Sequence, residues 1–380
     1  MIPFAWDAAR LTELADRHGT PCFVYDLATA RADYARLRSA LPARVTIAYA
    51  VKANPHEALL RTFADLGASF DCASSGELRR VESLASGRLF FTGPGKRTAE
   101  LQHALDLRAR IQAEGFEDLE RVERLAPSRI AVNLRVHPLA AIAESTRILG
   151  GNGPSAFGVD EEDLPDLAQR VARMRRVRIA GLHVFAASNE LDADRLAANH
   201  AAVFALARRM VKEFHFDLEQ IDLGGGLGVA YADDVAELDV GAVGRHLERL
   251  LAENDWFQGR VIVEPGRYLA ARCGVYLTRV VRTKRSRGTR FTILEAGVNH
   301  LLRPLLVGQP FPVRAVGVEG GATPTTLAGP LCTSLDRLGD VLLPELEPGA
   351  LIAFGRTGAY GATEAMTKFL SHPEAIEVAV

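Results

Sequence analysis

The chain has 380 residues, with 45 Lys and Arg against 47 Asp and Glu and a formal net charge of −2. Its composition is 48% hydrophobic and 24% charged, which is typical of a globular protein and leaves little room for long disorder. The balanced charge argues against general nucleic-acid binding, which needs a dense basic surface. No apolar run reaches membrane-spanning length, and residues 1–10 lack the basic start and apolar middle of a signal peptide.

Cysteine usage narrows the class of protein further. Cys22, Cys72, Cys273 and Cys332 lie far apart and form no CxxC pair. This spacing is typical of neither a disulfide framework nor a zinc ribbon, and it suits a reducing compartment. We therefore expect a cytoplasmic protein that has no metal site and makes no contact with membranes.

Strand-like and helical patterns alternate through the first two thirds of the chain. Strands are expected at 21–25, 44–51, 69–73, 89–92, 130–136, 179–185, 220–223 and 260–264, and helices at 58–66, 78–84, 164–174, 196–214 and 241–253. Such alternation predicts βαβ units and a parallel sheet. About eight units fit into residues 27–267, the usual size of a closed (β/α)₈ barrel. Periodicity alone leaves an open doubly wound sheet possible.

The pattern changes after Arg267. Strand candidates at 273–283, 290–294, 309–318 and 351–354 are separated by glycine, proline and charged turns, and long helical patterns are missing. We predict an all-β domain, either a sandwich or a barrel, made of residues 268–380. The early strand at 21–25 precedes the barrel pattern, so residues 1–26 are assigned to this second domain and residues 27–267 to the barrel.

A lysine follows the first predicted barrel strand, in the segment YAVKANP (49–55). Residues at the carboxyl ends of barrel strands point into the active site. A desolvated lysine has a lowered pKa, which leaves its amine free to form a Schiff base. Taken alone, Lys52 is better explained as a strand-end lysine whose amine reaches water.

Two further segments follow predicted strands. The glycine-rich segment 224–228 lets backbone N–H groups approach a phosphate, although glycine clusters are more often tight turns. In EPGR (264–267), Glu264 could hold a cationic nitrogen and Arg267 a phosphate, or the two could form a surface ion pair. Cys332 ends GPLC (329–332) on a predicted loop, where a thiol is open to reaction. Cys22 and Cys273 are expected to be small buried hydrophobes.

The order of these segments resembles the fold-type III pyridoxal-phosphate (PLP) decarboxylases, which include the diaminopimelate, ornithine and arginine decarboxylases. The matching stretches are TPCFVYD (20–26), YAVKANP (49–55), FDCASSGEL (70–78), GGGLG (224–228), EPGR (264–267), EAGVNHLLRP (295–304), GPLC (329–332) and GAYG (358–361). They extend over nearly the whole chain.

The resemblance implies a role for each matching position. Lys52 would hold PLP covalently, and Glu264 would bind the pyridine nitrogen and keep it protonated, as an adjacent carboxylate favours the charged form. A protonated ring is the electron sink for loss of CO₂ from Cα. The phosphate would be held by Ser188, Gly224, Gly225, Gly226, Arg267 and Tyr360. Asp71 and Glu77 would lie near the cofactor and the lysine.

The resemblance also implies how substrate is handled. Arg303 would bind a substrate carboxylate. Cys332 would come from the partner subunit of a head-to-tail homodimer and protonate the carbanion, so that a monomer should be inactive.

Three positions depart from the family pattern. Phe185 stands where many relatives carry a histidine that stacks on the pyridine ring; phenylalanine can stack but cannot carry charge. Thr333 follows GPLC, where diaminopimelate decarboxylases have an acidic residue that reads the distal ammonium, and His300 replaces another acidic residue. A site without these acids is poorly built for a free cationic diamine substrate.

We therefore predict a decarboxylase that acts on the α-amino acid moiety of a modified or carrier-tethered substrate, in secondary metabolism or siderophore assembly. Diaminopimelate decarboxylase is the alternative, followed by an amino-acid racemase or an inactive regulatory homologue. The glycine-rich segment 150–154 is expected to be a mobile lid or to leave room for a bulky substrate.

Overall fold

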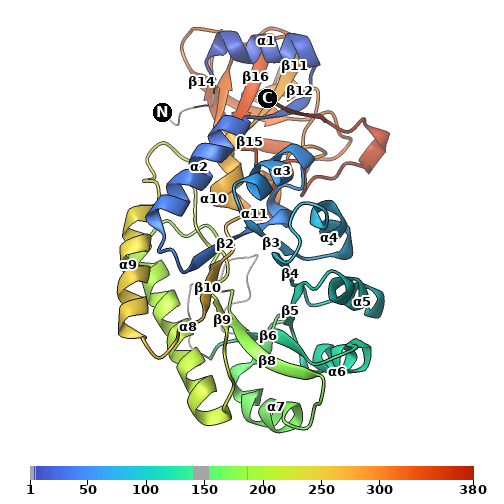
Figure 1. The fold of residues 1–380 in the computed structure, drawn as a ribbon. Helices are drawn as coiled ribbons and strands as arrows, with labels where there is room; N and C mark the ends of the chain where they lie inside the picture. Colours follow the sequence, from blue (N-terminus) through green and yellow to red (C-terminus); the bar gives the residue numbers. More distant parts are fainter. Residues whose placement is uncertain (1–3, 5, 140–153, 186) are drawn as a thin grey trace. The chain divides into compact units, whose positions relative to one another are not determined.

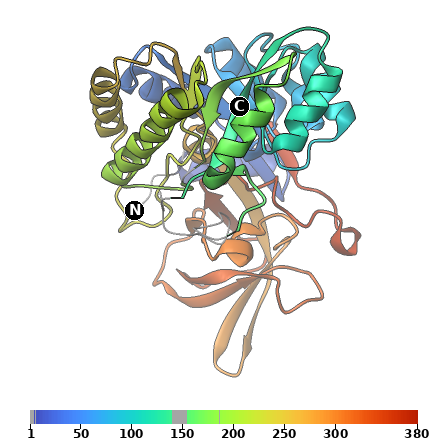
Figure 2. The ribbon, with the colours of Figure 1, turned by 90° about the horizontal axis from the view of Figure 1, so that it is seen from below.

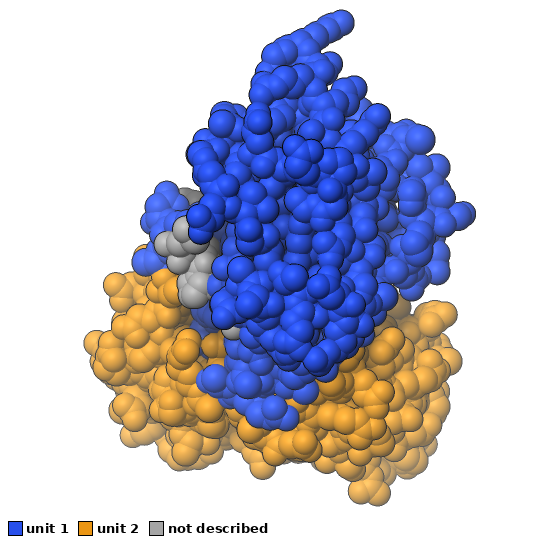
Figure 3. Space-filling model, turned by 90° about the horizontal axis from the view of Figure 1, so that it is seen from above, with its two compact units in different colours: residues 1–32, 230–236, 267–380 blue, residues 33–229, 237–266 orange. Residues whose placement is uncertain are grey.

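The computed structural model describes residues 4, 6–139, 154–185 and 187–380. The chain divides into two compact units (Figure 3). Unit 1 comprises residues 1–32, 230–236 and 267–380, and unit 2 comprises residues 33–229 and 237–266. The predicted segment 150–154 lies outside the described residues except for Pro154.

Unit 2 is a closed barrel of parallel strands. In ring order the eight strands are β2 (Val45–Ala50), β3 (Ser69–Cys72), β4 (Leu89–Phe91), β5 (Arg110–Ala113), β6 (Ile130–His137), β8 (Val177–His183), β9 (Gln220–Asp222) and β10 (Arg260–Val263). Pairing of Gln112 with Asn133 joins β5 to β6 and closes the ring. The predicted barrel is therefore confirmed, and the open doubly wound sheet is excluded.

Helices surround the barrel strands (Figures 1 and 2). They are α3 (Glu57–Asp65), α4 (Ser75–Val81), α5 (Thr98–Asp106), α6 (Phe116–Leu125), α7 (Leu164–Val171), α8 (Ala193–Phe214) and α9 (Val240–Glu253), while α2 (Leu27–Ala40) precedes β2. The short strand β7 (Val159–Asp160) extends beside β6. Apolar residues on the inner helix faces are buried, as Leu59, Leu60 and Phe63 show in α3. The strands carry few exposed side chains because helices cover the outside of the sheet.

Unit 1 is a mostly β domain with an eight-stranded sheet. Its elements are α1 (Ala8–His18), β1 (Cys22–Tyr25), α10 (Arg267–Ala270), β11 (Gly274–Ser286), β12 (Thr289–Leu294), α11 (Arg303–Val307), β13 (Val313–Ala315), β14 (Thr323–Ala328), β15 (Arg337–Leu343), β16 (Leu351–Gly355) and β17 (Ile376–Ala379). Strand β1 pairs with β11 and with β17, which brings the two ends of the chain into one sheet. The second β domain is thus confirmed.

Several elements differ from the sequence predictions. Helix α1 was not predicted; it begins at an Asp7 cap that accepts from the Arg10 amide, and it buries Leu11 and Leu14 against Val24 and other residues of the sheet. Strands β14, β15 and β17 were also missed. The predicted strand 309–318 is reduced to β13, because proline and glycine interrupt the flanking residues.

No helix in the described ranges combines the length and the apolar character needed to cross a bilayer.

Candidate active site

Polar side chains gather where the barrel strands end. Lys52 lies in the short 3₁₀ turn Val51–Ala53 directly after β2, and Asp71 lies in the neighbouring strand β3. The amine Nζ of Lys52 is 3.2 Å from Oδ2 of Asp71, whose side chain is fully buried, while the Lys52 side chain is 39% exposed. The Thr92 hydroxyl donates to the other oxygen of Asp71. Asp71 is therefore fixed and holds the lysine amine at the mouth of the barrel.

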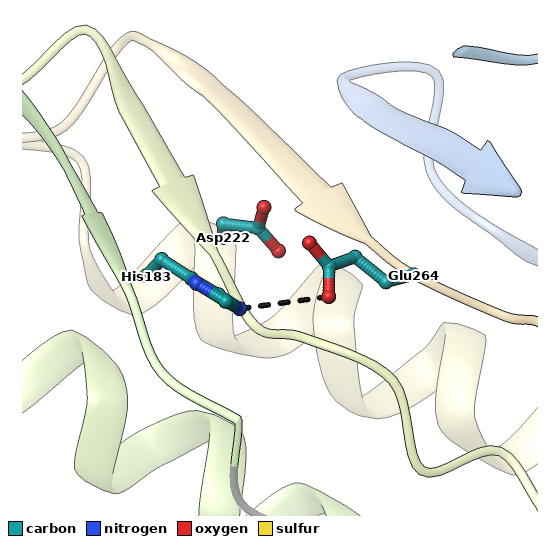
Figure 4. Close-up of side chains that lie close together, drawn as sticks. All are labelled: His183, Asp222 and Glu264. Atoms are coloured by element: carbon teal, nitrogen blue, oxygen red, sulfur yellow. Dashed lines mark ion pairs between the residues drawn. The ribbon is translucent and has the colours of Figure 1, made fainter. Parts of the chain in front are cut away.

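A second cluster occupies the ends of β8, β9 and β10 (Figure 4). His183, Asp222 and Glu264 are all buried, and each offers a ligand atom within 4.8 Å of the others. Nε2 of His183 lies 3.5 Å from Oε2 of Glu264. A metal ion could bridge this spacing, but the cluster equally suits a cationic ring nitrogen. Oε1 of Glu264 is buried and has no hydrogen-bond partner among the described residues.

The two carboxyl groups of this cluster titrate in opposite directions. Burial raises the pKa of Asp222 well above its usual range, and the charge of Glu264 raises it further. Burial alone would also raise the pKa of Glu264, but the charge of His183, a hydrogen bond with it and the charge of Lys52 lower that pKa below its ordinary value. The neighbouring charges therefore favour the ionised form of Glu264, and burial beside Glu264 favours the protonated form of Asp222.

The glycine-rich loop after β9 packs against the ends of its neighbours. Gly224 has φ 67°, and a Cβ there would lie 2.7 Å from the Val184 carbonyl oxygen. A Cβ on Gly225 would lie 2.9 Å from the Glu264 carbonyl oxygen, and one on Gly226, at φ 104°, 3.1 Å from Ala187. These close approaches leave room only for glycine. Glycine adds no side chain that could cover the backbone amides of this loop, of which the Gly224 amide is already bound to Oδ1 of Asp222.

Phe185 lies beyond β8, where the family places a stacking ring. Its ring centroid is 5.7 Å from the Lys52 amine and 5.9 Å from the guanidinium carbon of Arg135. Arg135 is held by Glu114 at 2.9 Å and also faces the ring of Phe157. Two cations thus flank the Phe185 ring, and their charges disfavour a further positive charge at this position. Ser188 is half-buried in the same loop.

Unit 1 contains the other predicted anion-binding residues. Arg267 begins α10, and its guanidinium contacts the Tyr231 hydroxyl at 3.1 Å and Oε1 of Gln309 at 3.4 Å. The Tyr360 ring, at a backbone φ of 60°, lies 4.9 Å from the guanidinium carbon of Arg267 and 4.7 Å from that of Arg303. The structure therefore brings Arg267, Tyr360 and Arg303 together.

The predicted substrate-binding residues already have partners within unit 1. Nη1 of Arg303 lies 2.6 Å from Oε2 of Glu364, and the Arg303 side chain is 3% exposed. The two ring nitrogens of buried His300 lie 2.9 Å from the Tyr276 hydroxyl and 2.9 Å from the Pro373 carbonyl. His300 is thereby fixed as a link between β11 and the C-terminal segment.

The loop after β14 presents Cys332 to solvent, whereas Cys22, Cys72 and Cys273 are buried. Its neighbour Thr333 caps the following bend, since its hydroxyl accepts from the Leu335 amide at 3.3 Å.

The sequence reasoning missed two residues of the barrel cluster, Asp222 and Gln112. Nε2 of Gln112 donates to Oδ2 of Asp222 at 2.8 Å, and both side chains are fully buried. A signal was present in the sequence for Asp222, because this residue stands in a predicted strand two positions before the Gly224 turn. Buried polar groups of this kind require partners.

These residues fit PLP. The cofactor needs an amine for its aldehyde, an anion for its ring nitrogen and an unobstructed set of amides for its phosphate. Unit 2 supplies the Lys52 amine, the buried carboxylate of Glu264 and the glycine-only loop 224–226. The geometry defines a barrel enzyme of the PLP-dependent class.

Comparison with known proteins gives the same answer. Residues 27–271 match the family described as pyridoxal-dependent decarboxylase, pyridoxal binding domain, and the chain belongs to this family. It is a PLP-dependent carboxy-lyase that decarboxylates an amino acid group.

The named relatives act on different substrates. The chain is 32% identical to the L-glutamyl-[BtrI acyl-carrier protein] decarboxylase of Niallia circulans, over 98% of this chain and 91% of that protein. It is also 32% identical to the diaminopimelate decarboxylase of Zymomonas mobilis, over 100% of this chain and 94% of that protein. The crystal structure of Helicobacter pylori diaminopimelate decarboxylase with L-lysine superposes with a TM-score of 0.89 at 28% identity, covering 97% and 93% of the two chains.

Proposed function

We propose that this decarboxylase acts on an amino acid tethered to a carrier protein, with a glutamyl group as the first candidate. The observation that carries the proposal is the absence of the acidic reader after Cys332, where Thr333 stands. The glutamyl-carrier decarboxylase of Niallia circulans supports it, since that relative is similar over 98% of this chain. Carrier-dependent biosynthesis, a homodimeric state and a cytoplasmic location are parts of the same proposal.

The chemistry fixes how such a substrate is attached. Loss of CO₂ from Cα requires a free α-carboxylate and a free α-amine, so the carrier must be linked through the side chain. A glutamyl side chain joined as a thioester or amide has lost its distal negative charge. The distal end of the substrate is then neutral, and neither an acidic nor a basic reader is needed for it.

The ion pair of unit 1 agrees with a neutral distal group. Arg303 would read a carboxylate in the family pattern, but Glu364 holds its guanidinium at 2.6 Å. A buried arginine that is neutralised by its own chain attracts a second carboxylate only weakly. A free dicarboxylic or diamino-dicarboxylic acid would have to displace Glu364 first.

The barrel residues then act on the cofactor and the α-carbon. When bound, PLP supplies an electron sink for the pair of electrons left by departing CO₂. Ionised Glu264 would keep the ring nitrogen protonated, and Phe185 would offer an aromatic face to the cofactor ring. Oδ2 of Asp71 lies 3.2 Å from the Lys52 amine and would orient this amine toward the cofactor aldehyde. Cys332 would donate a proton to Cα, so that H replaces CO₂ at this carbon.

Release of CO₂ from three purified substrates tests the proposal. They are a glutamyl group linked through its side chain to a phosphopantetheinyl carrier protein, free glutamate and meso-diaminopimelate. We expect kcat/KM for the tethered substrate to exceed that for either free amino acid by at least about 100-fold, the scale set by one misplaced charged group. Equal or better turnover of meso-diaminopimelate would contradict the tethered assignment.

Diaminopimelate decarboxylase remains the second candidate. Relatives with that name match 97–100% of this chain at up to 34% identity, and the solved structure with L-lysine has a TM-score of 0.89. The same assay separates the two candidates, because diaminopimelate carries a charged distal end that a side-chain-linked substrate does not.

A further inference from the structure

Asp222 occupies a buried position that the family roles leave unexplained. It ends β9, its side chain is fully buried, and it lies beside Glu264 at the end of β10 (Figure 4). Two groups hold it in place: the Gly224 amide donates to Oδ1 at 3.0 Å, and Nε2 of Gln112 donates to Oδ2 at 2.8 Å. The carboxyl group therefore has one orientation relative to its neighbour.

Oxygens of Asp222 and Glu264 lie within 4.8 Å of each other, and both side chains are buried. Two buried carboxyl groups this close together resist ionisation of both at once. The donors from Gly224 and Gln112 favour a charged Asp222, whereas burial and the adjacent Glu264 disfavour it. Burial is the largest of these effects and raises the Asp222 pKa, with the charge of Glu264 next and the more distant Asp71 also contributing. Glu264 instead faces His183 and Lys52, whose charges stabilise its anion.

We propose that Asp222 is a positioning residue that acts as a neutral carboxylic acid, donating its proton in a hydrogen bond to Glu264. This bond would keep Glu264 ionised and hold its carboxylate in one orientation for the ring nitrogen of PLP. Gln112 and the Gly224 amide hold the Asp222 carboxyl group in place. Asp222 therefore contacts both the glycine loop and Glu264, the residue that would bind the ring nitrogen. The inference rests on the family's use of PLP and is independent of the tethered substrate proposed above.

The alternative is an ionised Asp222 that adds a second negative charge near the ring nitrogen. Asp222→Asn separates the two cases. An asparagine amide still donates to Glu264, and Gln112 can turn its own amide to accept, since its Oε1 has no partner among the described residues. Asp222→Leu removes the donor and keeps similar bulk.

The experiment measures the PLP dissociation constant and the bound-cofactor absorption from pH 5 to pH 9 in both variants. We expect Asp222→Asn to keep affinity within about threefold, and Asp222→Leu to weaken PLP about 10- to 100-fold, the scale of one hydrogen bond to a charged group. Loss of the donor raises the pKa of Glu264, so Glu264 becomes protonated at a higher pH than in the wild type. On acidification, Asp222→Leu should therefore lose PLP affinity at a higher pH than the wild type.

An ionised Asp222 predicts the opposite direction. Both variants would then remove a like charge from Glu264, and the acid limit of cofactor binding would move to lower pH in each. That result, or an Asp222→Asn variant as impaired as Asp222→Leu, would overturn the proposal. Asn199→Leu, which replaces another buried polar side chain of unit 2, is the matched control.

A measurement on the unmodified enzyme keeps the test open if the leucine variant does not fold. Infrared spectra of the holoenzyme should contain the absorption of a protonated carboxyl group at neutral pH. That band should disappear in Asp222→Asn. A spectrum without any such band, or one that is unchanged in Asp222→Asn, would show that Asp222 is ionised.

Discussion

Nη1 of Arg303 lies 2.6 Å from Oε2 of Glu364, so a residue expected to bind substrate is paired within its own chain. The pair is almost fully buried on the arginine side, where the exposed fraction is 3%. Burial raises the cost of separating the two charges, because neither regains full hydration. The Tyr360 ring packs at 4.7 Å from the same guanidinium and restricts its movement further.

Glu364→Gln should release Arg303 for a carboxylate-bearing substrate. We expect the ratio of kcat/KM for free glutamate to that for the tethered substrate to rise about tenfold, the size of one recovered charged contact. Steady-state kinetics with both substrates measure this ratio. The exposed pair Lys368–Glu374 offers a matched control, and Glu374→Gln should leave the ratio unchanged. No change in Glu364→Gln would mean that Arg303 does not read the distal group.

Cys332→Ala should slow turnover about 10²- to 10⁴-fold, the usual contribution of a positioned general acid, while PLP stays bound. Cys332 is the exposed cysteine of the chain, and the other three are buried. Brief treatment with iodoacetamide should therefore modify Cys332 first and cause the same loss of turnover. The control variant Cys273→Ala, which changes a buried cysteine, should turn over normally. Full activity in Cys332→Ala would show that another group protonates Cα.

The same variant tests the shared active site. If Cys332 serves the partner's lysine, mixing Lys52→Ala with Cys332→Ala and allowing subunits to exchange should restore about 25% of wild-type activity, because half of the dimers gain one intact site. Each variant alone should remain inactive. A mixture with no recovered activity, despite demonstrated exchange, would place Cys332 and Lys52 in one subunit's site.

Phe185→His should keep the cofactor but change the rate or the substrate preference. The Lys52 amine at 5.7 Å and the Arg135 guanidinium at 5.9 Å make a second cation costly, so the new imidazole should be neutral. Titration with PLP and kcat/KM for the three substrates give the two readouts. Phe185→Leu serves as the control that removes the aromatic face. Identical kinetics in wild type and Phe185→His would mean that the departure at this position has no functional weight.

His200 should make stability depend on pH. It is buried in α8, where burial, with the nearby charge of His246, lowers its pKa from 6.5 to about 4. In the unfolded chain, His200 therefore binds a proton below pH 6.5, whereas in the folded chain it stays neutral down to about pH 4. The free energy of unfolding consequently falls as the pH drops through this range. The predicted loss is about 3 kcal/mol.

Urea unfolding of wild type and His200→Gln at pH 7 and pH 4.5 measures this contribution. The glutamine variant should lose about 2–3 kcal/mol less on acidification. His246→Gln removes the nearby charge but leaves the burial of His200, the larger cause, so most of the acid-induced loss should remain in this variant. Equal losses in wild type and His200→Gln would remove His200 as the cause.

The sequence predicted those parts of the fold whose periodicity is strong. Runs such as 44–51 and 260–264 are nearly continuous apolar strands, and their alternation with helices was sufficient for the barrel. Short strands with polar faces carry no such pattern. Strand β14 (TPTTLA) and strand β17 (IEVA) are stabilised by pairing with β12, β15 and β1, which depends on contacts distant in the chain.

Individual site residues could be predicted only where a motif marked them. Lys52 and Glu264 stand in recognisable segments at strand ends, and the structure places both at the carboxyl end of the barrel. The raised pKa of Asp222 depends on burial by the whole barrel and on Glu264, 42 positions away. The Arg303–Glu364 ion pair likewise joins residues 61 positions apart, so no local sequence pattern predicts it.

Reduction of the holoenzyme with borohydride, followed by mass spectrometry of its peptides, tests the central claim most directly. The reagent fixes PLP on whichever amine holds it. The account predicts a single phosphopyridoxyl group on the peptide that contains Lys52, and none on peptides that contain Lys96 or Lys212. A label on any other lysine, or an active enzyme that carries no label, would contradict the account.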